Sequence, residues 1–99
     1  MTINKTKENG KITFALEGRL DVSTAPMLQD ALIPAFNETK EVVIDFKKLT
    51  HLYTDGLRVL LIAQKEADAK GVDLTVVHVS KSIMQILVMT NFVKILNIV

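Results

Sequence analysis

The 99-residue sequence predicts a single α/β domain with a mixed β-sheet. Apolar runs of strand length alternate with segments whose apolar residues recur at helical spacing. An Asn-Gly pair between the first two strand-like runs predicts an antiparallel hairpin. Each later strand-like run is followed by a helical segment, which is typical of parallel crossover connections. We therefore expect a hairpin first and parallel strands after it.

The chain is expected to begin with this hairpin. Its strands should cover residues 3–6 and 12–16, on either side of Asn9-Gly10. Asn-Gly supplies the positive φ angles of a tight turn at little cost. The second run, ITFAL, is almost entirely apolar, which indicates a buried strand.

The first helix is expected to follow the turn after residue 21. Ser23 or Thr24 can cap it, and Pro26 suits its first turn. Pro34 removes a backbone donor and should kink or end the helix near Ile33. The apolar stripe of this helix comprises Met27, Leu28, Ala31, Leu32 and Ala35.

A central strand and a second helix follow. The strand contains the apolar run 42–44, which predicts coverage on both faces, as in parallel sheets. The helix should start at Asp55 or Gly56, run to Lys70 and stop at Gly71 in the left-handed conformation. Its expected core stripe is Val59, Leu60, Ala63 and Ala67.

The C-terminal part predicts a fourth strand over 72–79 and a third helix capped by Ser80. Asn91 can take the left-handed position where that helix ends. We expect Met84 and Val88 in the core, with a docking surface as the alternative. The remaining residues should form a short strand or turn. The expected core face of the helix is Ile83, Ile86, Leu87 and Thr90.

Composition excludes several functional classes. The formal net charge is +1, from 12 basic and 11 acidic residues, so nothing favours nucleic acid or an anionic membrane as partner. There is no cysteine for a disulfide, a thiolate metal site or a nucleophile. No apolar run approaches the roughly 20 residues that span a bilayer. The first residues lack the apolar core of a signal peptide, which predicts a cytoplasmic protein.

No catalytic constellation is found in the sequence. His51 and His78 lack the spacing of metal ligands, and we interpret them as a loop residue and a strand-end residue. No glycine-rich phosphate loop or nucleophile elbow occurs. Asp45 ends a strand as a phosphate-receiver aspartate would, but the acidic pair such a site needs is missing. We predict no enzyme activity, no cofactor and no metal.

The junction Thr54-Asp55-Gly56 joins the central strand to the second helix. One interpretation is capping, because Thr and Asp are favoured helix N-caps and each contributes about 1 kcal/mol. The other is that Thr54 accepts a phosphate, which adds about −1.5 to −2 charges. The unpaired N–H groups at a helix start tolerate that charge. A partner pressed against Thr54 and Asp55 would not.

The second helix carries apolar residues beyond its core stripe. On a helical wheel Leu57, Leu61 and Ile62 fall outside the stripe and flank Arg58. Exposed apolar side chains beside a charge are typical of a docking face. The alternative is that the neighbouring helix covers Leu57 and Leu61.

Taken together, these motifs resemble STAS domains of the anti-sigma-factor-antagonist type over nearly the whole chain. The strongest matches are residues 18–21, 24–26, 43–45, 56–61 and 90–92. The resemblance implies a mixed sheet with helices mainly on one side. It also implies a bacterial regulator that is not an enzyme. Such a protein binds an anti-sigma factor that is a serine/threonine kinase of the histidine-kinase-like ATPase fold, and so releases a sigma factor for transcription.

The resemblance also implies residue roles. The family's phosphoacceptor lies two positions before the Gly of the Gly-Leu pair, which is Thr54 here. Its phosphorylation would break the complex, and a phosphatase would reset it. Tyr53 stands where the family usually has Asp or Ser, and Asp55 where it has Ser or Ala. The expected partner-binding residues are Asp21, Thr24, Asp55, Gly56, Leu57, Arg58, Leu61 and Ile62.

Two other functions stay open at this point. STAS domains also serve as constitutive adaptor subunits of lipid-transport or signalling complexes, in which Thr54 would be only a helix cap. An enzyme or phosphocarrier would use His51 or Asp45. Acid-stable phosphothreonine would distinguish the antagonist from that third class.

Overall fold

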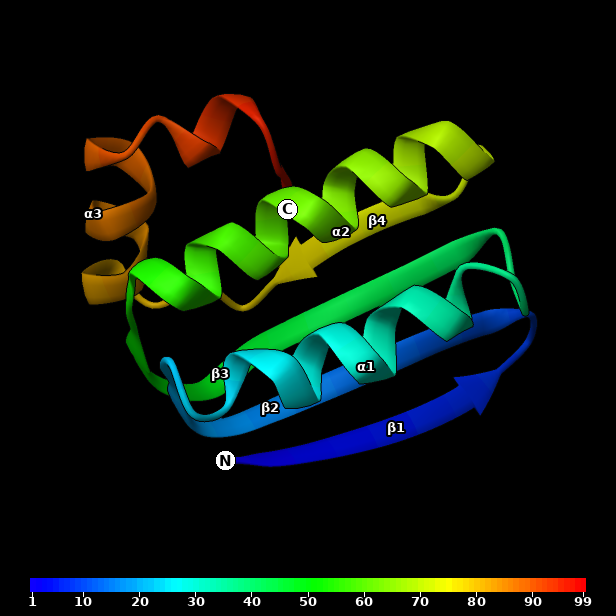
Figure 1. The fold of residues 1–99 in the computed structure, drawn as a ribbon, viewed down its shortest axis with the longest axis horizontal. Helices are drawn as coiled ribbons and strands as arrows, with labels where there is room; N and C mark the ends of the chain where they lie inside the picture. The colour runs from blue at the N-terminus through cyan, green and yellow to red at the C-terminus, as the bar shows by residue number, and fades with distance from the viewer.

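The computed structural model describes residues 1–99, which form a five-stranded sheet and three α-helices (Figure 1). The strand order is β1-β2-β3-β4-β5; β1 and β2 are antiparallel, and the other neighbours are parallel. This confirms the predicted α/β class with its hairpin and parallel strands. In chain order the elements are β1 (Thr2–Glu8), β2 (Lys11–Leu20), α1 (Ala25–Ala35), β3 (Glu41–Leu52), α2 (Thr54–Lys70), β4 (Asp73–Val77), α3 (Lys81–Met89), the 3-10 helix η1 (Phe92–Lys94) and β5 (Asn97–Ile98).

The helices α1 and α2 lie side by side over one face of the sheet, and no helix covers the opposite face (Figure 1). Alternate strand residues such as Phe14, Ile44 and Val76 are buried beneath the helices. Val43 and Asp45 point to the uncovered face and are only half-buried. The expectation that this strand is covered on both faces is therefore wrong. Apolar residues on both sides of a strand do not require two helical layers.

The first helix differs from its expected stripe at one position. Met27 is 47% exposed, whereas Ala25, Leu28, Leu32 and Ala35 are buried. Met27 is therefore no core residue, because its neighbour Leu28 already fills the side of α1 that faces the sheet. The helix continues through Pro34 and ends at Ala35, with the Phe36 N–H closing the last turn.

The start and stop residues predicted for the C-terminal helices are confirmed. Gly71 and Asn91 adopt left-handed conformations, with φ of 66° and 64°, after α2 and α3. The Ser80 hydroxyl accepts a hydrogen bond from the Ile83 N–H, which confirms Ser80 as the cap of α3. Val88 is 54% exposed, so its expected place in the core is wrong. The reason is that α3 lies at the end of the sheet and packs on one side only (Figure 1).

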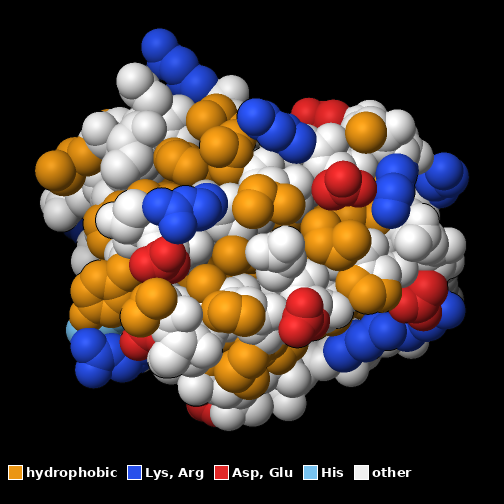
Figure 2. Space-filling model, in the orientation of Figure 1, with side chains coloured by type: hydrophobic (Ala, Val, Ile, Leu, Met, Phe, Trp, Pro, Cys, Tyr) orange, Lys and Arg blue, Asp and Glu red, His pale blue; other side chains and the backbone are white.

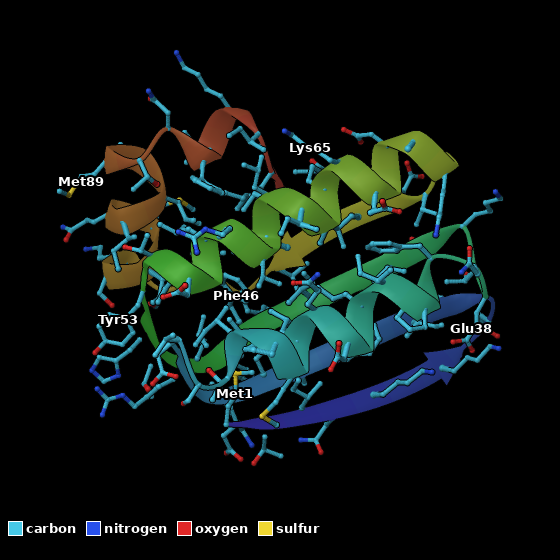
Figure 3. The ribbon with its side chains drawn as sticks, in the orientation of Figure 1. Met1, Glu38, Phe46, Tyr53, Lys65 and Met89 are labelled. Atoms are coloured by element: carbon cyan, nitrogen blue, oxygen red, sulfur yellow. The ribbon has the colours of Figure 1, made fainter.

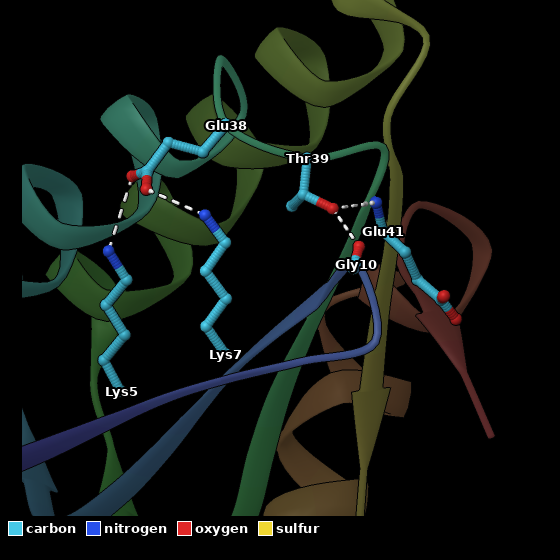
Figure 4. A network of polar contacts seen from close by, with 6 residues as sticks. All are labelled: Lys5, Lys7, Gly10, Glu38, Thr39 and Glu41. Carbon is cyan, nitrogen blue, oxygen red and sulfur yellow. Dashed lines mark hydrogen bonds and ion pairs between the residues drawn. The ribbon is translucent and has the colours of Figure 1, made fainter.

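A polar network closes the opposite end of the sheet (Figure 4). Glu38, in the loop after α1, pairs with Lys5 at 3.4 Å and with Lys7 at 3.8 Å. The Thr39 hydroxyl donates a hydrogen bond to the Gly10 carbonyl of the hairpin turn. Figure 3 labels Glu38 at this end and Tyr53 at the other, where the candidate site lies.

Candidate functional site at the start of the second helix

Thr54 is the first residue of α2, and its side chain is exposed. The preceding residue, Tyr53, is the extended N-cap residue, and its side chain makes no capping hydrogen bond. The helix therefore starts one residue before the predicted Asp55. Because Thr54 and Asp55 already lie inside the helix, the interpretation that either of them is the N-cap is wrong. The first-turn N–H groups are left without a side-chain cap.

Close packing fixes the position of this junction. The Tyr53 N–H donates a hydrogen bond to the Leu20 carbonyl at 3.0 Å, which ties the start of α2 to the end of β2. Gly56 is buried over Leu20 and Leu52. A Cβ at Gly56 would lie 2.6 Å from Leu20 Cγ and 3.0 Å from Leu52 Cδ1. A side chain at position 56 would push the helix away from the strand ends.

The turn between β2 and α1 is organised by Asp21. Its carboxylate accepts hydrogen bonds from the Ser23 N–H and hydroxyl at 3.0 and 2.8 Å, and from the Thr24 N–H at 3.2 Å. The Ser23 hydroxyl contributes most to holding the pKa of Asp21 below its usual 3.8; burial opposes it, and the backbone N–H groups assist. The buried Thr24 hydroxyl donates to the Arg19 carbonyl at 2.8 Å. Thr24, one of the two predicted capping residues, is the N-cap residue of α1, but its side chain makes no capping hydrogen bond because its hydroxyl is engaged with this turn.

A shallow depression of about 640 Å³ lies between the ends of β2, β3 and α3, the β2–α1 turn and the start of α2. The β2–α1 turn contributes Asp21, and the start of α2 contributes Thr54, Asp55 and Leu57. The sequence motifs and the family resemblance together predicted functional roles for all of these. It assigned no functional role to the residues that line the depression from the ends of β2 and β3 and from α3, because no local pattern shows that these segments meet. The most prominent are Arg19 of β2, Tyr53 directly after β3, Ile86 of α3 and Thr90 directly after α3.

An ordered stack of exposed side chains borders this depression. The Arg19 guanidinium lies 5.8 Å from the centre of the Tyr53 ring, and its Nη2 donates to the Tyr53 hydroxyl at 3.0 Å. The other neighbour of Tyr53 is His51, whose ring is 6.0 Å away and inclined by only 3°. His51 Nδ1 lies 2.9 Å from the Thr50 hydroxyl. The side chains at the ends of β2 and β3 are thus held by one another.

The predicted docking residues of α2 differ in exposure. Arg58 is exposed and pairs with Asp55, with 3.1 Å between Nη1 and Oδ1. Leu57 is only 8% exposed and belongs to the core, as the alternative interpretation held. Leu61 and Ile62 are half-buried, and Ile62 lines a groove of about 280 Å³ beside α1. Figure 2 shows hydrophobic side chains between charges of both signs on this helical face.

Neither histidine side chain forms a hydrogen bond with Thr54. His78 follows β4 in a left-handed conformation, and its Nδ1 is 2.9 Å from Asp45 Oδ1. His51 belongs to the stack with Tyr53. The structure contains no group of three side chains that could hold a metal ion, and no helix long and apolar enough to cross a membrane.

Comparison with known proteins identifies the fold. The chain resembles the crystal structure of an anti-sigma factor antagonist from Mycobacterium paratuberculosis, with a TM-score of 0.87 at 20% identity, covering 98% of this chain and 83% of that one. The phosphorylated form of SpoIIAA, a Bacillus cell fate determinant, matches with a TM-score of 0.77 at 12% identity, covering 99% and 91%. A sulfate transporter family protein from Wolinella succinogenes matches with a TM-score of 0.79 at 18% identity, covering 91% and 74%.

At these identities the structural likeness establishes a shared fold. No match is found among curated protein sequences. The family model for the STAS domain, however, matches residues 2–99. This match confirms the resemblance to STAS domains drawn from the sequence motifs, and the chain belongs to the STAS domain family.

Proposed function

We propose that this chain is an anti-sigma factor antagonist whose binding is controlled by phosphorylation of Thr54. The observation that carries the proposal is the position of Thr54, exposed on the first turn of α2 and at the edge of the depression. Solved structures of the same fold from Mycobacterium and Bacillus are anti-sigma factor antagonists. The domain acts as a binding module, not as an enzyme.

Because Thr54 is exposed, its phosphorylation would change the charge of the surface and leave the fold intact. A phosphate there adds about −1.5 to −2 charges beside the uncapped N–H groups of the helix start, which favour negative charge. Its neighbour Asp55 is already an ion-pair partner of Arg58. A protein that covers Thr54 would have to desolvate a dianion next to a carboxylate. An affinity loss of about a hundredfold corresponds to only about 2.7 kcal/mol.

The partner under this proposal is an anti-sigma factor that is also the serine/threonine kinase, of the histidine-kinase-like ATPase fold. The unmodified antagonist sequesters this kinase in the bacterial cytoplasm, and the sigma factor becomes free for transcription. A phosphatase removes the phosphate from Thr54. The docking surface comprises Asp21, Asp55, Arg58, Leu61 and Ile62. The buried residues Thr24, Gly56 and Leu57 hold this surface in shape.

The test uses wild type, Thr54→Ala, Thr54→Glu and Thr6→Glu as paired baits in native cytosol, with retained proteins identified by mass spectrometry. Thr6→Glu places the same charge on an exposed residue of β1 and controls for charge alone. We expect an ATPase of the kinase fold on wild type, Thr54→Ala and Thr6→Glu, and its loss from Thr54→Glu. The purified kinase should phosphorylate wild type but not Thr54→Ala. Equal retention by all four baits would refute the switch.

The likeness to a sulfate transporter family protein favours a second candidate, a constitutive STAS adaptor. An adaptor of a lipid-transport or signalling complex would hold its partner regardless of the charge at position 54. A transport ATPase or scaffold protein retained equally by wild type and Thr54→Glu would support this second candidate and contradict the first.

A further inference from the structure

Arg19 is an exposed cation without an acidic partner in the folded chain. The ion pairs of the structure use other basic side chains: Lys5, Lys7, Lys48, Arg58, Lys70 and His78. Two carboxylates share the depression with Arg19, but both are engaged. Asp21 accepts its hydrogen bonds from its own turn, and Asp55 pairs with Arg58. The charge of Arg19 is therefore not neutralised within the chain.

The guanidinium of Arg19 is nevertheless held in place. The Tyr53 hydroxyl accepts a hydrogen bond from the guanidinium, and the guanidinium also makes a cation–π contact with the Tyr53 ring. Tyr53 is itself stacked on His51. The neighbouring Thr50 hydroxyl donates to the Gly18 carbonyl at 2.9 Å, which joins β3 to β2 beside the stack. Guanidinium has five N–H donors, so donors remain for a second acceptor. An ordered arginine also loses less conformational entropy on binding than a mobile one.

The position of Arg19 decides what kind of group it meets. It lines the same depression as Thr54, so a protein that covers Thr54 also covers Arg19. Covering an unpaired charge without neutralising it is strongly unfavourable. A planar guanidinium with free donors fits a carboxylate, which it can bind through two parallel hydrogen bonds.

We infer that Arg19, held by Tyr53, binds an Asp or Glu carboxylate of the protein partner and determines which partner is accepted. This inference rests on the proposed function, because it assumes that the partner covers the Thr54 depression. It adds a chemical requirement that the Thr54 switch does not contain. The partner presents an acidic side chain opposite the end of β2.

The experiment repeats the affinity capture with Arg19→Glu and Lys65→Glu as matched baits. Lys65 is an exposed lysine further along α2, away from Tyr53, and it forms no ion pair (Figure 3). We expect the protein retained by wild type to be retained by Lys65→Glu and lost from Arg19→Glu. Its dissociation constant, measured by calorimetry with the purified protein, should rise about tenfold or more for Arg19→Gln and less for Arg19→Lys.

A charge reversal identifies the carboxylate. Each Asp or Glu of the captured partner is replaced by Lys in turn, and each variant is tested against Arg19→Glu. One replacement should restore binding to Arg19→Glu while weakening binding to wild type, which an indirect structural effect of Arg19 would not produce.

Tyr53→Phe keeps the ring and removes the hydroxyl. It should weaken binding less than Arg19→Gln does.

Binding of Arg19→Gln within twofold of wild type overturns the inference, as does the absence of any rescuing replacement. The inference is also overturned if no captured protein is retained by Lys65→Glu and lost from Arg19→Glu. The Thr54 variants test the proposed switch independently of Arg19. Loss of binding in Thr54→Glu together with normal binding in Arg19→Glu keeps the switch and removes the role of Arg19. The reverse result refutes the switch and leaves Arg19 as the recognition residue of a constitutive adaptor.

Discussion

At the scale of single residues, the site depends on a close approach of α2 to the ends of β2 and β3. Gly56 permits this approach because it has no Cβ, and Leu20 occupies the space that a Cβ would need. Leu20 is fully buried, so it cannot move aside into solvent. The exposed position of Thr54 therefore depends on a buried glycine close by.

We predict that Gly56→Ala destabilises the fold by about 1–3 kcal/mol, because an overpacked core forces side chains from their rotamers. Urea unfolding followed by circular dichroism measures the change. Leu20→Ala removes the atoms that would clash. The double variant should therefore cost less than the sum of the two single variants. Strict additivity would show that Gly56 does not act through Leu20.

A second residue-scale prediction concerns Asp45. Burial alone would raise its pKa, but the Lys47 N–H at 2.9 Å, the contact with His78 and the charges of both hold the pKa below 3.8. Ionised Asp45 therefore stabilises the fold above pH 3.8, and this contribution is lost as the pH falls through the lowered folded-state pKa.

Unfolding free energies of wild type and Asp45→Asn, measured between about pH 6 and pH 2.5, test this sign. The free energy of unfolding of wild type should exceed that of Asp45→Asn most at the highest pH of this range, and the difference should shrink as the pH falls. Asp73→Asn is the control, because Asp73 is exposed and makes no ion pair or side-chain hydrogen bond. An advantage of wild type that grows on acidification would contradict the assignment.

At the scale of elements, α3 is the least supported helix near the site. It has 9 residues against 17 in α2, and it buries only Ile83 and Leu87. Short helices gain little from propagation and depend on caps and packing. Its start is fixed by Ser80, and its last turns line the depression through Ile86 and Thr90. Loss of the cap should therefore loosen one wall of the site.

We predict that Ser80→Ala destabilises α3 by about 1 kcal/mol. Amide hydrogen exchange should become faster in α3, for example at Leu87, and stay unchanged in the middle of α2. Gln85→Ala is a suitable control, because Gln85 is exposed on the same helix and its side chain forms no hydrogen bond. Equal acceleration in both variants would show that the Ser80 cap contributes nothing.

At the scale of the whole molecule, the proposed switch acts without unfolding. Thr54 is exposed, and the helix start beside it accepts negative charge. We predict that Thr54→Glu changes the free energy of unfolding by less than about 0.5 kcal/mol, as exposed substitutions usually do. Thermal unfolding measures this, and Thr6→Glu provides the comparison. A large loss of stability in Thr54→Glu alone would mean that any binding defect reflects unfolding.

The fold was predictable because each element carries its own signals. Asn9-Gly10 marks the hairpin, Gly71 and Asn91 mark helix ends, and Ser80 marks a helix start. These signals are local, and local backbone geometry follows them. Side-chain capping was predicted at Thr24 and Thr54, but other contacts prevail at both positions. The hydroxyl of Thr24 bonds to the β2 end, and Thr54 lies inside a helix that begins at the packing contact with Leu20.

The sequence by itself determined the α/β class, the hairpin, the parallel order and the position of the Thr54 junction, because periodicity and turn residues act within a few positions. Only the tertiary structure decided that Leu57 is buried, that Val88 is exposed and that Arg19 rests on Tyr53. These last two residues are 34 positions apart, and they meet because β2 and β3 are neighbours in the sheet. Strand pairing brings together side chains that no local pattern connects.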